Sequence, residues 1–234
     1  MKSTIQDKAK LVNSVFSKVY NKYDLMNDIM SLGIHRIWKD KFIDWMNPSY
    51  NSSLIDVASG TGDIAKLFSL RNKNLPSITC IEPNENMFKK GKSNLVNFKN
   101  IKWIKSRAET LPVEDNMYDF YSISYGIRNV SGINKTLREA YRVLKPGGRF
   151  MCLEFSKIDN ELLNALYKNY SKIIPTLGKY IAGSSKPYEY LIDSIDTFYN
   201  QEQFLELITK NGFANVEYRN LSNGISAIHS GWKI

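Results

Sequence analysis

The stretch Leu54-Ile-Asp-Val-Ala-Ser-Gly-Thr-Gly-Asp63 joins a run of apolar residues to a glycine-rich turn. Residues 54–58 are typical of a buried strand, and those from about 63 to 70 are typical of a helix. Glycines in such a turn let the backbone approach a ligand closely, and the N-terminus of the following helix offers free N–H groups. The turn is therefore a candidate binding site, although glycines also occur at this place in dinucleotide-binding enzymes.

Strands and helices continue to alternate beyond this turn. Strands are expected at 78–81, 101–105, 118–124 and 149–155, and helices at about 84–95 and 133–144. This alternation predicts a parallel sheet with helices on both faces. Two more strands, 213–221 and 224–228, are expected to form a hairpin, because Asn-Gly in Ser222-Asn-Gly224 is a strong turn signal. A seven-stranded α/β sheet that ends in an antiparallel hairpin resembles the Rossmann-like fold of class I S-adenosylmethionine-dependent methyltransferases.

The composition favours one globular domain. The chain has 234 residues, of which 43% are hydrophobic and 24% charged, and this is ordinary for a globular protein that buries its own core. Within a single domain, 1–234, we expect an N-terminal helical cap (1–50), a core (51–157), a helical lid insertion (158–200), and a C-terminal helix and hairpin (201–234). The two cysteines have no CxxC partner, and the histidines and acids lack ligand spacing, so we expect a reducing, cytoplasmic compartment and no metal site.

Most of the positive charge lies in one part of the chain. The net charge is +9, and residues 66–107 hold ten Lys or Arg and two Glu, a balance of +8. Such a run fits an anionic partner or a solvated face. Aromatic residues do not alternate with the basic ones, and the Asn/Asp-Pro-Pro-Tyr/Phe sequence of nucleic-acid methyltransferases is absent after the fourth strand. We therefore expect a solvated face and no nucleic-acid partner.

A carboxylate at the end of the second expected strand points to a nucleoside ligand. Glu82 stands twenty residues after Gly62, where an acidic side chain can accept hydrogen bonds from both ribose hydroxyls. Both NAD and S-adenosylmethionine carry that ribose, so Glu82 does not discriminate between the two cofactors.

Two further strings resemble class I methyltransferases and decide between the cofactors. They are Ser106-Arg-Ala-Glu-Thr-Leu-Pro112 and Tyr141-Arg-Val-Leu-Lys-Pro-Gly-Gly148. The resemblance implies that Arg107 and Ala108 flank the adenine of S-adenosylmethionine and that Ser124 lies beneath its sulfonium. The expected cofactor-binding residues are then Asp56, Gly60, Thr61, Gly62, Glu82, Arg107, Ala108 and Ser124.

Longer motifs resemble the ubiquinone/menaquinone biosynthesis C-methyltransferases over nearly the whole chain. They lie at 23–38, 124–130, 142–156 and 224–233. Two departures are that the family commonly has glycine where this chain has Ser59, and aspartate where it has Glu82. The resemblance implies methylation of a ring carbon on a polyprenylated benzoquinol or naphthoquinol.

The resemblance also suggests catalytic residues. A quinol oxygen must lose its proton before the ring carbon attacks, and Arg128 is expected to stabilise that oxygen, with Asn129 orienting it. Alternatively, Arg128 forms a salt bridge to an N-terminal acid such as Asp24. His35 is expected to act as a base or substrate ligand, with simple packing as the alternative. Tyr23 and Asp24 are expected to close over the cofactor.

Other functions and partners stay open at this point. A methyltransferase for a soluble small molecule would share the cofactor site, and a non-catalytic subunit of a quinone-biosynthesis complex would share the fold. A polyprenyl tail would favour peripheral contact with the inner membrane face, and residues 162–174 have one apolar helical face suited to a lid, a membrane contact or core packing. A homodimer and a quinone-biosynthesis complex are both compatible with the sequence.

Overall fold

The computed structural model describes most of the chain. It covers residues 33–49, 51–72, 76–158 and 185–234, together with positions 12, 17, 28, 31, 161, 165, 167, 169, 170 and 175. The strands are β1 (Leu54–Val57), β2 (Ile78–Ile81), β3 (Ile101–Ile104), β4 (Tyr118–Ser124), β5 (Leu144–Phe155), β6 (Ala214–Leu221) and β7 (Ser226–Trp232). The helices are α3 (His35–Met46), α4 (Asp63–Arg71), α5 (Glu85–Asn94), η2 (Ile127–Asn129), α6 (Ile133–Val143), α8 (Lys186–Asp196) and α9 (Gln201–Lys210).

The seven strands form one mixed sheet with the order β3-β2-β1-β4-β5-β7-β6. Strands β1 to β5 pair in parallel, and β7 pairs antiparallel with both β5 and β6. The expected class I methyltransferase fold with a C-terminal hairpin is therefore confirmed. The turn at Ser222, Asn223 and Gly224 has three consecutive residues with positive φ, as the Asn-Gly signal predicts.

Two strand boundaries differ from those expected by more than two residues. Strand β5 begins at Leu144 instead of residue 149, because Leu144 already pairs with Tyr118 of β4 ahead of a register shift. Strand β7 runs from Ser226 to Trp232 instead of ending at residue 228, because it lies between β5 and β6 and pairs along its whole length. Its polar residues are buried in the sheet, so the apolar pattern alone ends too early.

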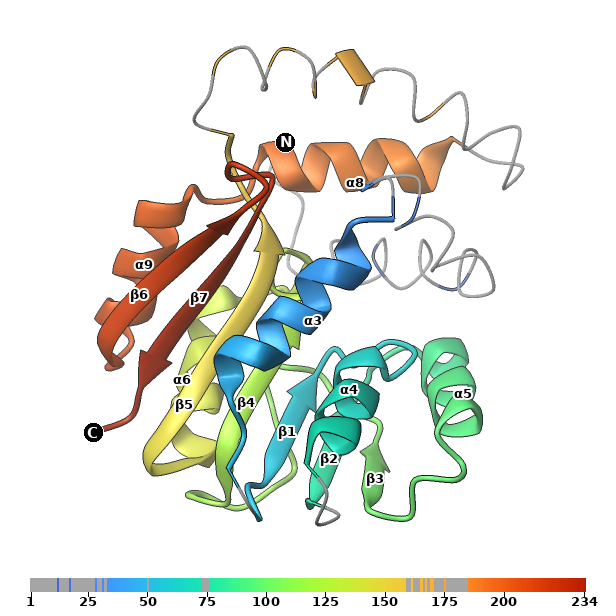
Figure 1. The fold of residues 1–234 in the computed structure, drawn as a ribbon, viewed down its shortest axis with the longest axis vertical. Coiled ribbons are helices and arrows are strands. Elements are labelled where there is room, and N and C mark those ends of the chain that lie inside the picture. Colours follow the sequence, from blue (N-terminus) through green and yellow to red (C-terminus); the bar gives the residue numbers. More distant parts are fainter. Residues whose placement is uncertain are drawn as a thin grey trace.

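Helices cover both faces of the sheet (Figure 1). Helices α3, α4 and α8 contribute to one buried apolar cluster, and α6 and α9 contribute to the other. The side chains of β1 alternate between the two clusters, with Leu54 in the first and Ile55 and Val57 in the second. Asp56 therefore points to the face that α3 and α4 cover.

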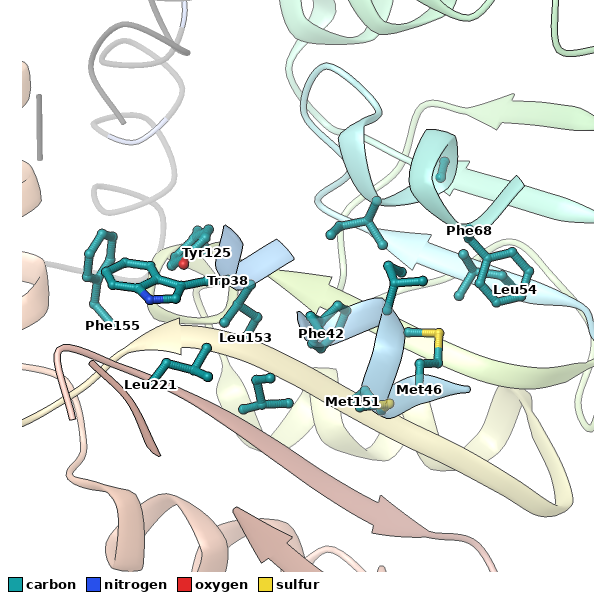
Figure 2. Packing of buried hydrophobic residues seen from close by; sticks show 14 of the residues in the cluster. Trp38, Phe42, Met46, Leu54, Phe68, Tyr125, Met151, Leu153, Phe155 and Leu221 are labelled. Atoms are coloured by element: carbon teal, nitrogen blue, oxygen red, sulfur yellow. The ribbon is translucent and has the colours of Figure 1, made fainter. Parts of the chain in front are cut away.

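Helix α3 anchors the N-terminal region to the sheet. Trp38, Phe42 and Met46 recur every four residues on its inner face, and Figure 2 shows them above Leu153 and Met151 of β5. The Trp38 indole also donates to the Ser222 hydroxyl at 3.1 Å, which connects α3 to the hairpin turn.

The expected division into cap, core, lid and hairpin stays an interpretation. Helix α3 lies in the cap and α8 in the lid insertion, whereas Tyr23, Asp24 and most of 162–174 lie outside the described residues. Among the helices that the structure describes, none is long and apolar enough to cross a bilayer.

Truncating Phe42 tests the role of α3. Its side chain is fully buried, so we expect Phe42→Ala to lower the free energy of unfolding by about 3–5 kcal/mol through lost burial and a residual cavity. Lys41→Ala, on the exposed side of the same helix, is the matched control and should change stability by less than about 0.5 kcal/mol. Chemical denaturation measures both, and equal effects would refute the packing role.

Candidate active site

The loop after β1 is a tight turn at the carboxyl end of that strand. Ala58, Gly60 and Gly62 all have positive φ. A Cβ on Gly62 would lie 2.5 Å from Leu95 Cδ1, so this position requires glycine. The Ser59 hydroxyl donates to the Asp56 carbonyl at 2.6 Å, and the Gly62 N–H donates to the Ser59 carbonyl at 2.9 Å. Ser59, where the resembling family has glycine, thus fixes the turn by its side chain.

Glu82 is tied to this loop by its carboxylate. Its Oε2 accepts from the Gly60 N–H and its Oε1 from the Asn84 N–H, each at 2.9 Å. Burial raises the pKa of the Glu82 carboxyl to about 7, although the two N–H donors favour the charged form. Each carboxylate oxygen has a second lone pair, so the predicted bonds from ribose hydroxyls are compatible with this arrangement.

Asp56 lies under the loop with one oxygen lacking a partner. Its Oδ1 accepts from the Ser122 hydroxyl at 2.6 Å, whereas Oδ2 is buried and has no hydrogen-bond partner in the described contacts. Burial raises the pKa of the Asp56 carboxyl to about 7. The buried Ser124 hydroxyl, at the end of β4, also has no partner in those contacts. Such acceptors and donors are costly to bury unless a ligand satisfies them.

A pocket lies at the carboxyl ends of β1 and β4, and neither Gly62 nor Glu82 is part of its lining. It is lined by Lys39, Asp56, Ala58, Ser59, Gly60, Thr61, Asp63, Ile64, Ser124 and Tyr125. Asp56, Gly60, Thr61 and Ser124 therefore come together as the sequence predicts. The orphaned oxygens and the open glycine loop fit S-adenosylmethionine, which carries an ammonium, a carboxylate and a ribose.

Arg107 and Ala108 are not part of the lining of this pocket. Ala108 is buried, whereas the Arg107 side chain is half exposed and donates to the Ser131 hydroxyl at 2.6 Å. Their loop follows β3, the strand next to the one that Glu82 follows. The contacts of these two residues with the adenine therefore stay predictions. Their loop lies next to the end of β2, which Glu82 follows.

Sequence reasoning missed two charged residues of the pocket. The Lys39 ammonium donates to Asp63 Oδ2 at 2.6 Å, and the Lys39 side chain is 9% exposed. The available signal is that Lys39 falls within the apolar stripe of its helix, between Trp38 and Phe42. A lysine is rarely this buried unless it is paired, and Asp63 supplies the partner.

Arg128 and Asn129 lie in η2, directly after β4. The Arg128 guanidinium is buried, forms an ion pair with Glu154 of β5, and donates to the Tyr125 carbonyl at 3.1 Å. The observed acidic partner is therefore Glu154, whereas Asp24 lies outside the described residues. Asn129 also donates to the Tyr125 carbonyl, at 3.3 Å. The two side chains thus meet at one backbone oxygen.

Helix α8 contacts both of these side chains. The Ser194 hydroxyl accepts from Arg128 Nε at 3.2 Å, and the Tyr190 hydroxyl donates to Asn129 Oδ1 at 3.0 Å. The predicted lid region therefore positions the predicted catalytic pair.

The two histidines are held in packed positions. His35 is buried against the Ser31 hydroxyl at 2.9 Å and Asp28 Oδ1 at 3.6 Å, and it is not part of the pocket lining. Burial and the nearby Lys39 charge lower the pKa of His35 to about 4, so its ring is neutral at pH 7 and a weak base. His229 is likewise buried, and burial lowers its pKa to about 4. This geometry agrees with the alternative that His35 is a packing residue and not a base or substrate ligand.

No cluster of three His, Cys, Asp or Glu among the described residues could hold a metal ion.

Comparisons with known proteins find relatives over nearly the whole chain. The model of the ubiE/COQ5 methyltransferase family matches residues 2–233. A protein of Rickettsia bellii, named ubiquinone/menaquinone biosynthesis C-methyltransferase UbiE, is 50% identical over 235 residues, 97% of this chain and 94% of its own length. A protein of the same name from Rickettsia prowazekii is 51% identical over 231 residues, 96% of this chain and 93% of its own length.

Solved structures share the fold at low sequence identity. An S-adenosylmethionine-dependent methyltransferase from Thermotoga maritima, described as a possible histamine N-methyltransferase, has a TM-score of 0.68 at 20% identity, covering 95% of this chain and 100% of its own. A phosphoethanolamine methyltransferase from Haemonchus contortus, in complex with S-adenosylhomocysteine, has a TM-score of 0.62 at 14% identity. The match covers 84% of this chain and 52% of that one. These similarities establish the methyltransferase fold.

The raised pKa of Glu82 predicts that cofactor binding depends on pH. The predicted hydrogen bonds from ribose hydroxyls require the ionised carboxylate, and the free protein favours the protonated form below a pKa of about 7. Affinity for S-adenosylhomocysteine should therefore fall as the pH is lowered from about 8 to about 5.5, by up to roughly tenfold per pH unit for each carboxylate that must ionise.

Calorimetry with two variants separates the carboxylates in this test. Glu82→Gln should bind S-adenosylhomocysteine more weakly near pH 8, and its affinity should depend less on pH than that of wild type. Burial also raises the pKa of Asp56 to about 7. Asp56→Asn should therefore remove the pH dependence that arises from ionisation of Asp56. A wild-type affinity that does not change over this range would show that neither carboxylate controls binding.

Proposed function

The chain belongs to the ubiE/COQ5 methyltransferase family, and on that premise we propose that it transfers the methyl group of S-adenosylmethionine to a ring carbon of a polyprenylated quinol in ubiquinone or menaquinone biosynthesis. The observation that carries this proposal is about 50% identity, over nearly the whole chain, to proteins named for that C-methylation. The cofactor loop with Asp56, Glu82 and its glycines is intact, which supports an active enzyme over a non-catalytic subunit.

The cofactor residues act mainly by positioning. Bound S-adenosylmethionine supplies an electrophilic methyl group on a positively charged sulfur. Glu82 is proposed to hold the ribose, the Gly60–Gly62 turn allows close approach of the backbone, and Ser124, at the end of β4, is proposed to lie beneath the sulfonium. Fixed orientation of two reactants can remove about 7–11 kcal/mol from a barrier, so a rigid site is central to catalysis.

Arg128 and Asn129 are the proposed substrate-activating residues. A quinol carbon becomes a good nucleophile when the neighbouring hydroxyl loses its proton, and the resulting oxyanion needs stabilisation. The contacts of Arg128 with Tyr125 and Glu154 fix its guanidinium at the carboxyl end of the sheet. Asn129, on the same short helix, is proposed to orient the oxygen. Tyr23 and Asp24 are proposed to close the site from the N-terminal segment.

The polyprenyl tail of the proposed substrate bears on where the protein works in the cell. A polyprenyl chain is held in a bilayer, so we propose a cytoplasmic protein that makes peripheral contact with the inner face of the membrane. The apolar face of residues 162–174 is the proposed contact, on the basis of its helical spacing in the sequence.

A methyl-transfer assay tests the proposed function. We expect the protein to transfer label from S-adenosylmethionine to a reduced short-chain 2-methoxy-6-prenyl-benzoquinol or to demethylmenaquinol, and mass spectrometry should place the label on a ring carbon. Label on oxygen, or transfer only to soluble substrates without a prenyl chain, would contradict the proposal. A protein that binds S-adenosylhomocysteine but methylates neither quinol would also contradict it.

A paired substitution tests Arg128. Removing Arg128 alone leaves Glu154 buried without its cation, which costs about 3–5 kcal/mol of stability. The double variant Arg128→Gln and Glu154→Gln keeps two hydrogen-bonding amides and removes both charges. We expect kcat to fall by roughly 10²–10³ through loss of oxyanion stabilisation, with unchanged S-adenosylhomocysteine affinity as the control for folding. A kcat within a few-fold of wild type would assign Arg128 a structural role.

A further inference from the structure

Lys39 is a buried cation that faces the cofactor pocket from α3. Among the described residues that line the pocket, it is the single lysine or arginine. Its ammonium pairs with Asp63 at 2.6 Å, and Asp63 lines the same pocket from the first turn of α4. A paired lysine at this place offers a positive charge to a ligand that can replace its partner.

Asp56 gives an independent indication of a charged ligand group in the same pocket. The Asp56 side chain is 1% exposed, and its Oδ2 has no hydrogen-bond partner in the described contacts. Asp56 and Lys39 therefore line one pocket, where they offer an acceptor and a cation. An amino acid group carries the complementary pair, an ammonium and a carboxylate.

We propose that Lys39 is a specificity residue that binds the α-carboxylate of the methionyl part of the cofactor, exchanging Asp63 for that carboxylate, while Asp56 accepts from the α-ammonium. This inference rests on the proposed function, because it concerns the same cofactor. It assigns a binding role to a residue of the N-terminal cap, outside the β1 loop and the strand ends.

The exchange of partners is physically reasonable because Asp63 has a second source of stabilisation. Asp63 is the first residue of α4, and unpaired N–H groups and the helix dipole favour a negative charge there. Asp63 can therefore keep its charge when the Lys39 ammonium turns to the ligand. Lys39, in contrast, is buried and needs an anion at all times, so Asp63 is its partner in the free protein.

This role makes the pocket selective for an intact amino acid end. When a nucleoside without the carboxylate binds, Lys39 stays paired with Asp63, and the cation adds nothing to the affinity. The discrimination is carried by α3, which also packs against β5 through Phe42. Cofactor occupancy and the position of the N-terminal cap are thereby linked through one side chain.

The test compares three ligands that differ only at the amino acid end. S-adenosylhomocysteine carries both charged groups, 5′-(3-aminopropylthio)-5′-deoxyadenosine lacks the carboxylate, and 5′-methylthioadenosine lacks both. Calorimetric affinities are measured for wild type, Lys39→Gln, Asp63→Asn and Lys66→Gln. Lys66 lies on the exposed side of α4, so its substitution controls for the loss of one positive charge.

We expect Lys39→Gln to bind S-adenosylhomocysteine roughly 10- to 100-fold more weakly, the effect of losing a charge-assisted hydrogen bond. The other two ligands and Lys66→Gln should be unaffected. Asp63→Asn removes the competing anion, so it should bind S-adenosylhomocysteine as tightly as wild type or more tightly. This variant also keeps the test valid if Lys39→Gln is unstable.

Two results would overturn the inference and are distinct from failure of the proposed function. If Lys39→Gln weakens all three ligands equally or none of them, Lys39 does not contact the carboxylate. If Asp63→Asn weakens S-adenosylhomocysteine binding while Lys39→Gln does not fold, the ion pair is structural. A wild-type protein that binds none of the three ligands would instead refute the methyltransferase assignment itself.

Discussion

The parallel pairing of β1 with β2 on one side and β4 on the other is the constraint on which the site depends. Chain connections leave β1 in one direction and β4 in the other, so the loops at their carboxyl ends diverge and leave a crevice. The glycine turn after β1, Glu82 after β2 and Ser124 at the end of β4 all face this place because parallel strands end at one edge. Helix α3 covers the crevice from the side and adds Lys39.

The geometry of this edge is maintained at a cost in stability. Asp56 and Glu82 are buried carboxylates whose raised pKa values report that their charged forms are poorly solvated. Ala58 and Tyr125, at the ends of β1 and β4, both have a positive φ that non-glycine residues rarely adopt. A Cβ on Gly126 would lie 2.6 Å from the Ala58 Cβ, so glycine at position 126 lets the β4 loop pack against Ala58 at the side of the crevice. Such strain is typical of sites in which position matters more than stability.

The sequence predicts those parts of the site that depend on local pattern. The β1 turn and Glu82 follow from strand, glycine and spacing rules, and the hairpin follows from Asn223-Gly224. The partner of Arg128 could not be predicted in this way, because Glu154 lies 26 residues away and meets it only through the pairing of β4 with β5. Lys39 was missed because a lysine on an amphipathic helix is ordinarily assigned to the solvated face, and only the packing of α3 against α4 places it inside.

The position of β7 between β5 and β6 also affects how the chain folds as it is synthesised. Strand β5 ends at Phe155, and its outer neighbour β7 begins only at Ser226, so residues 156–225 emerge from the ribosome first. During that interval the nascent sheet has an open edge of backbone N–H and C=O groups, which can recruit another chain. Strand β6 cannot cover this edge, because it touches the sheet only through β7. The exposure of this edge until the hairpin docks is thus a consequence of strand order alone.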